Sequence, residues 1–149
     1  MTLATRRDPY LNYRFQVEVD SLLVGGFAEV SGLGYELQTE EYEEGGVNGF
    51  THHLPTRVSH DNIVLERGLT DSTELFDWAD ATVHGVIDRR NCRVFLANAA
   101  GEERWGWELR GAYPVSWNGP NLQADGGDVA MESLELAHRG LSRIDGLPQ

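Results

Sequence analysis

Strict alternation between apolar and polar side chains is the feature that constrains this sequence most. In residues 13–19, Tyr13, Phe15, Val17 and Val19 fall on one side and polar residues fall on the other. Successive side chains of a β-strand point to opposite faces, so this pattern predicts a strand with one buried face. The alternation recurs over residues 35–42, 63–66, 104–110 and 129–138. We therefore expect a mainly β protein, built as an antiparallel β-sandwich or barrel.

Further strands are expected on either side of one flanking helix. Residues 22–30 and 92–98 are predicted strands, and residues 103–117 should pair back with an interruption at Pro114. A capping box from Asp71 to Glu74 and apolar residues at helical spacing predict a helix over about residues 72–87. Its apolar stripe is expected to consist of Leu75, Phe76, Ala79, Val83, Val86 and Ile87.

The 149 residues are expected to form a single domain, because a chain of this length can bury one core and shows no internal repeat. Residues 1–12 read as a polar N-terminal arm and residues 140–149 as a C-terminal tail. Between the strands at 35–42 and 62–69 lies a long connection, residues 43–61. Compact domains rarely keep so long a connection without a use for it, so we interpret it as an assembly loop.

The chain is strongly acidic, with 24 acidic residues against 12 basic ones and a formal net charge of −12. Such a surface repels nucleic acid and anionic membranes, so tight binding to either is not expected. Every basic residue apart from the histidines is arginine. A salt-adapted host or a GC-rich genome would each explain this composition. Stability that does not rise between low and molar salt would exclude the first explanation.

No membrane anchoring is expected, since no apolar run approaches the roughly 18 residues that a transmembrane helix needs. The first ten residues carry two arginines but no apolar core of a signal peptide behind them. The sequence therefore favours a protein made and kept in the cytoplasm, or one that leaves by a route without a cleaved signal.

Histidines offer the richest candidate for chemistry, because His52, His53 and His60 lie in one stretch with Asp61 beside them. A zinc site needs three or four converging ligands. Adjacent residues of an extended loop point apart, so at most one of His52 and His53 could join His60. We therefore predict no metal site, and we interpret these histidines as hydrogen-bonding groups at a surface or interface.

The remaining candidates are better explained by structure than by catalysis. Cys92 is the only cysteine and lies in an apolar run, which favours a buried thiol over a nucleophile. The acidic cluster around Glu40 lacks the ligand spacing of a calcium loop. Four tryptophans are interpreted as core or subunit contacts, although in a small ligand-binding β-barrel they would line a pocket. We predict no catalytic residues and no cofactor, and hence not an enzyme.

Several short motifs follow one another along the chain. They are the segments 8–10 (DPY), 13–19 (YRFQVEV), 25–33 (GGFAEVSGL), 41–46 (EYEEGG), 53–55 (HLP), 62–70 (NIVLERGLT), Trp78 and 132–138 (ESLELAH). Taken together and in this order, they resemble the tail-tube proteins of contractile phage tails and related contractile injection systems. The similarity covers nearly the whole chain.

The resemblance implies a structural subunit of the inner tube of a contractile system. Members of the family assemble as stacked hexameric rings, in which strands of all subunits join into one ring-shaped β-barrel. The tube lies inside a sheath, stands on a baseplate and conducts cargo or DNA. A baseplate-proximal tube initiator of the same fold is the alternative within the family, and a small ligand-binding β-barrel is the alternative outside it.

The resemblance also implies roles for individual residues. Contacts between subunits and rings are expected from the N-terminal arm and the long loop, that is, from Tyr10, Glu44, Val47, Phe50, His52, His53, Leu54 and Arg57. On the acidic strand at 35–42, Glu36, Gln38 and Glu40 are expected to face the lumen. Negative charge there would keep nucleic acid or acidic cargo from sticking.

Overall fold

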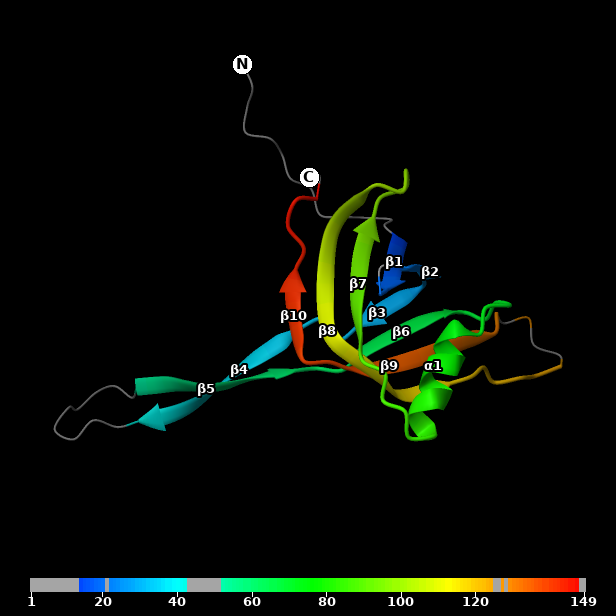
Figure 1. The fold of residues 1–149 in the computed structure, drawn as a ribbon. Coiled ribbons are helices and arrows are strands. Elements are labelled where there is room, and N and C mark those ends of the chain that lie inside the picture. Colours follow the sequence, from blue (N-terminus) through cyan, green and yellow to red (C-terminus); the bar gives the residue numbers. More distant parts are fainter. Residues whose placement is uncertain (1–13, 21, 43–51, 125–126, 128, 148–149) are drawn as a thin grey trace, which may run out of the picture.

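A computed structural model describes residues 14–20, 22–42, 52–124, 127 and 129–147. The described chain is mainly β with one helix, as the alternation predicts (Figure 1). In chain order the elements are β1 (Arg14–Val19), β2 (Leu22–Phe27), β3 (Glu29–Ser31), β4 (Tyr35–Tyr42), β5 (His52–His60), β6 (Ile63–Gly68), α1 (Glu74–Val83), β7 (Arg90–Ala97), β8 (Glu103–Asn118), β9 (Met131–Ala137) and β10 (Gly140–Arg143). Within the described residues, no helix has the length and apolar character to span a membrane.

Eight of the strands form one hydrogen-bonded sheet that folds into two antiparallel layers, with seven of them in one continuous path. The path runs in the order β2-β1-β7-β8-β9-β6-β3, and β10 pairs with β8 beside it. The first layer contains β2, β1, β7, the first half of β8 and β10. The second layer contains the end of β8, β9, β6 and β3. The expectation of an antiparallel sandwich is confirmed, and the described strands of one subunit do not make a closed barrel.

The long strand β8 belongs to both layers. Its residues up to Ala112 pair with β7, and its residues from Tyr113 pair with β9. Close to this changeover, Gly111 has a positive φ of 60°. A few residues later, the register with β9 shifts between Pro114 and Ser116. A local bulge bends a strand without ending it. Pro114 therefore marks a bend within one strand and not the interruption that the sequence predicts.

The core lies between the two layers and is built from the residues that alternate inward. The first layer contributes residues such as Val17 and Val94, and the second contributes Ile63, Leu65 and Leu134, all of them almost fully buried. Burying each such side chain stabilises the fold by about 1.5–3 kcal/mol. The alternating strands predicted for these segments are therefore confirmed in β1, β6 and β9.

The helix α1 is shorter and differently anchored than expected. It ends at Val83, because Gly85 takes a positive φ of 91° and turns the chain away. The N-cap is Thr73, without a side-chain cap hydrogen bond, so the predicted capping box is wrong. Of the predicted stripe only Leu75 and Ala79 are buried, whereas Phe76, Val83, Val86 and Ile87 are exposed. Trp78, which the predicted stripe did not include, is the third buried residue of the helix.

Two segments interpreted as irregular contain strands. The predicted loop 43–61 is wrong over His52–His60, which form β5 paired with β4. The predicted tail 140–149 is wrong over Gly140–Arg143, which form β10 paired with β8. Apolar and polar residues do not alternate regularly in HHLPTRVSH or in the four residues of GLSR, and the sequence pattern therefore missed both strands. Beyond β10, Ile144 and Leu147 close over Gly106, where an added Cβ would lie 3.1 Å from each of them.

Candidate assembly surface

A two-stranded hairpin projects from the body of the fold (Figure 1). It consists of β4 and β5, which pair from Tyr35 opposite His60 to Tyr42 opposite His52. The register shifts once, near Thr56, whose hydroxyl donates to the carbonyl of Gln38 at 3.1 Å. We call this pair of strands the hairpin arm. It continues the β3–β6 pair outward, beyond the two-layered core.

The hairpin arm is open to solvent on both faces. All eight residues of β4 are exposed, as are residues 53–58 of β5. An isolated two-stranded hairpin is marginally stable in water, since it buries little apolar surface. Within the part of the chain that the structure describes, β4 and β5 pair only with each other, and an outer strand edge of this kind can pair with a further strand. A partner that covers the arm would therefore stabilise it.

One face of the arm is apolar near the body. Residues directly opposite each other in an antiparallel pair share a face, and Leu37 lies opposite Val58 while Thr39 lies opposite Pro55. Tyr35 is on the same face, two residues before Leu37. Tyr35 is 68% exposed and Leu37 and Val58 are each 51% exposed. We call Tyr35, Leu37, Pro55 and Val58 the apolar arm face.

The other face of the arm carries two of the three acidic residues of β4, Glu36 and Glu40. Glu36, Gln38 and Glu40 lie opposite Ser59, Arg57 and Leu54, in that order. The three candidates for the lumen thus share one face, together with Leu54 and Arg57, which we expected to contact other subunits. His53 lies opposite Glu41 on the apolar side. We call this second surface the acidic arm face.

Most of the other predicted contact residues cannot be placed on either face of the arm. Tyr10, Glu44, Val47 and Phe50 lie outside the described residues. His52 is the first residue of β5, and its backbone pairs with Tyr42. The sequence did not single out Tyr35, Leu37 or Val58 as contact residues. The pattern that could have indicated them is the alternation in β4, whose apolar residues are not covered by a second layer among the described strands.

The base of the arm is held to the body by a small polar network. Asn62 donates from its side chain to Glu135 at 3.2 Å, and His138 Nε2 lies 3.0 Å from the Asp61 carbonyl. The rings of His60 and His138 lie 5.2 Å apart. At the same place Gly32 has a positive φ of 86°, and a Cβ there would lie 2.0 Å from the Asn62 carbonyl oxygen. Only glycine fits where the two strands leave the body.

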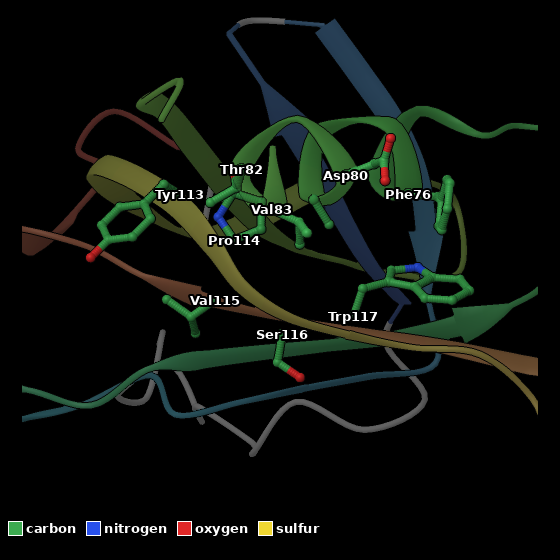
Figure 2. A pocket seen from close by; sticks show the side chains of 10 residues that line it. Phe76, Asp80, Thr82, Val83, Tyr113, Pro114, Val115, Ser116 and Trp117 are labelled. Carbon is green, nitrogen blue, oxygen red and sulfur yellow. The ribbon is translucent and has the colours of Figure 1, made fainter. Parts of the chain in front are cut away.

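A shallow groove lies between α1 and the end of β8 (Figure 2). Phe76 and Trp117 meet edge to face in it, with ring centroids 4.9 Å apart. Val83 and Val115 add exposed apolar surface, and Asp80 lies at the helix side. The tryptophans do not gather in this groove: Trp78 is in the core and Trp105 contacts Trp107 in the first layer. This arrangement disfavours a ligand pocket lined by tryptophans.

The described residues hold no arrangement suited to metal binding. No group of three or more His, Cys, Asp or Glu side chains converges in them. The Cys92 thiol is fully buried, and burial, with the nearby Asp20 charge, raises its pKa to about 12. A thiol with such a pKa is not a nucleophile near neutral pH.

One buried ion pair was not anticipated from the sequence. Arg67 of β6 donates from Nε to Glu132 of β9 at 2.7 Å, and the two side chains are only 5% and 3% exposed. Arg67 also donates from Nη1 to the Val24 carbonyl at 3.0 Å. The pair thus joins β6, β9 and β2 inside the sandwich. Both residues lie on the buried side of their strands, as Arg67 does with Ile63 and Leu65. A charged residue at an inward position of the alternation is the sequence pattern that could have indicated the pair.

Residues 11–142 match the family model of the T4-like virus tail tube protein gp19. The match spans most of the chain, and the chain therefore belongs to this family of tail tube proteins. Its role is structural: it is a tube subunit of a contractile phage tail or a related contractile injection system. A comparison with curated proteins gives no match.

Solved structures share the fold over nearly the whole chain. A chain of the PVC sheath–tube complex, from an extracellular contractile injection system in its extended state, is 30% identical and covers 91% of both chains with a TM-score of 0.80. A chain of the PVC sheath/tube terminator is 29% identical, covers 94% of this chain and 99% of its own, and has a TM-score of 0.82. Hcp1 from Flavobacterium johnsoniae, at 21% identity, covers 89% and 96% with a TM-score of 0.61 and shares the fold alone.

Proposed function

We propose that copies of this chain assemble into closed rings that stack into a hollow tube, with the hairpin arm as the contact between copies. A hexamer is the ring size that the family resemblance implies. A ring requires a heterologous contact, in which one patch of a subunit meets a different patch of the next. An arm that projects from the body is suited to such a contact, since it can reach a neighbour that the body does not touch.

The observation that carries the proposal is the exposed apolar arm face. Tyr35, Leu37 and Val58 are half or more exposed, and they lie together on a hairpin that none of the other described strands covers. Covering the exposed half of a leucine or valine side chain contributes about 1 kcal/mol. The apolar arm face against a neighbouring copy would therefore contribute several kcal/mol to each contact, and a closed ring repeats that contact at every subunit.

The acidic arm face would then be directed to the lumen. Glu36 and Glu40 lie on it, and the chain as a whole has a net charge of −12. A lumen lined by carboxylates repels nucleic acid and other acidic cargo, which would pass without tight binding. Leu54 and Arg57 share this face, so in this arrangement they line the lumen or its rim.

The tube would work together with a sheath and a baseplate. The similar chains come from a sheath–tube complex and a sheath/tube terminator in an extended state, and another similar fold comes from a baseplate. We assign this chain to the repeating part of the tube. A ring next to the baseplate would use the same arm, and such a ring would need its baseplate partners in order to assemble.

The experiment compares Leu37→Asn with Leu54→Asn by sedimentation and negative-stain microscopy at high salt, which screens the net charge. The two leucines are matched, being 51% and 49% exposed on opposite faces of the arm. Wild type and Leu54→Asn should form rings or tubes. Leu37→Asn should raise the assembly threshold about fivefold for each contact, from a loss of about 1 kcal/mol. Circular dichroism should show that all three proteins are folded.

Two results would count against the proposal. Assembly blocked by Leu54→Asn and untouched by Leu37→Asn would show that the acidic arm face is the contact surface. A wild-type chain that stays monomeric at high concentration and high salt would exclude a self-assembling tube subunit. In that case the baseplate-proximal alternative predicts that rings form only when baseplate proteins are added.

A further inference from the structure

Two histidines from different parts of the chain meet where the hairpin arm leaves the body. His60 is the last residue of β5, and His138 lies between β9 and β10. Their ring centroids are 5.2 Å apart at an angle of 51°, and both residues are half-buried. Tyr35 of β4 lies edge-on to His60 at 6.4 Å. The pair is therefore a contact between the arm and the body.

The hydrogen bonds at this place define the protonation of His138. Its Nε2 lies 3.0 Å from the Asp61 carbonyl oxygen, which can only accept, so Nε2 carries the proton. In the neutral ring Nδ1 is then unprotonated. The Nδ1 atoms of His60 and His138 are both buried and have no hydrogen-bond partner among the described residues. A proton added to the Nδ1 of His138 would therefore be poorly accommodated, and the Gly140 backbone offsets only part of this cost.

The surroundings of His138 also favour its neutral form. Burial lowers the pKa of His138 below its ordinary value of 6.5. Hydrogen bonding to the Asp61 backbone, and to a smaller extent to the Gly140 backbone, raises this pKa and offsets part of the effect of burial. Proximity to His60 and to Arg110 of β8 lowers this pKa further. The carboxylate of Glu135, on β9, accepts a hydrogen bond from Asn62.

We propose that the contact of His138 with His60 is an acid-sensitive joint that holds the hairpin arm to the body while His138 is neutral and releases it when His138 is protonated. A proton on His138 adds a positive charge beside Arg110 and an N–H group at a buried Nδ1 that makes no hydrogen bond among the described residues. The joint lies within one subunit. It goes beyond the role of the arm in assembly and stands or falls independently of it.

The direction of the pH dependence follows from proton linkage. A histidine whose pKa is lower in the closed arm than in the open arm binds more protons when the arm is open. The closed arm is therefore fully stabilised above about pH 6.5 and loses stability as the pH falls toward the lower pKa of the closed form. Each unit of difference between the two pKa values makes opening about tenfold easier at the acid limit.

Hydrogen exchange of the unassembled full chain tests the joint, at about pH 7.5 and pH 5 and with correction for intrinsic rates. Protection of the β4 and β5 amides near the body should fall on acidification, whereas protection of the central strand β7 should not. His138→Gln keeps an N–H donor for the Asp61 carbonyl but cannot be protonated, so it should remove the pH effect. His53→Gln, at an exposed histidine of the same arm, should behave like wild type.

Loss of arm protection that is equal in His138→Gln and wild type would overturn the proposal, as would wild-type protection that does not change with pH. If His138→Gln does not fold, NMR titration of the wild-type histidines decides. The midpoint of the His138 ring signals should then lie below 6.5 and coincide with the loss of arm protection. A midpoint at or above 6.5 would overturn the joint.

Discussion

Glu132→Gln should destabilise this protein more than most single substitutions would. The carboxylate of Glu132 lies 2.7 Å from Arg67 Nε, and both side chains are at least 95% buried. A charge in the interior is tolerated when it is paired and is costly when it is left alone. Glutamine keeps the shape of the side chain and can accept one hydrogen bond, but it removes the counter-charge of the guanidinium.

The magnitude follows from the burial of the pair. Removing one partner of a buried ion pair costs about 3–5 kcal/mol, whereas replacing both by apolar residues is often neutral. Arg67 Nη2 already has no acceptor among the described residues, so the guanidinium has little to compensate for the lost carboxylate. We expect Glu132→Gln to lie in this range. The double variant Arg67→Met/Glu132→Leu should be within about 1 kcal/mol of wild type.

Urea unfolding of the unassembled chain, followed by tryptophan fluorescence and circular dichroism, measures these differences. Glu108→Gln is the matched control, because Glu108 pairs across strands with Arg93 at 3.5 Å on a more exposed surface. Exposed pairs contribute about 0–1 kcal/mol. A loss of unfolding free energy in Glu132→Gln no larger than that in Glu108→Gln would contradict a costly unpaired charge at Arg67. A double variant less stable than either single variant would contradict it as well.

Two further outcomes test the backbone and the buried thiol. Gly32→Ala should cost at least about 2 kcal/mol in urea unfolding, since its Cβ would collide with the Asn62 carbonyl; Gly101→Ala, with a similar positive φ and open space around it, should cost about 1 kcal/mol. A Gly32→Ala cost no larger than that of Gly101→Ala would contradict the close approach. Cys92, with a pKa of about 12, should not react with a thiol reagent at about pH 8 until urea unfolds the chain. Rapid labelling of the native protein would show that the thiol is accessible.

Alternation predicts strands well where one face is buried and the other is wet. It located β1, β6 and β9, whose inward residues form the core. It also located β4, although all eight residues of that strand are exposed, but it did not locate β5, the other strand of the hairpin arm. Pro55 and the register shift near Thr56 obscure the pattern in β5. The missing information is the surface that covers the arm.

The prediction of the site was limited for a similar reason. The sequence predicted an assembly role for this region, and it assigned Leu54 and Arg57 to subunit contacts and Glu36 to the lumen. The pairing of β4 with β5 places these three residues on one face. A strand register depends on contacts between distant segments, and one residue of slip exchanges the two faces. Sequence alone could not fix the register around the bulge near Thr56.

The sharing of β8 between the two layers has a mechanical consequence. Sandwich layers that touch only through side chains can separate once those contacts yield. Here 16 consecutive residues run through both layers, and the strand is bonded to β7 and β10 in one and to β9 in the other. Tension applied to one layer therefore reaches the other through the covalent backbone of β8. The two layers therefore cannot be pulled apart by breaking side-chain contacts alone, because hydrogen bonds between β8 and its neighbouring strands must also break.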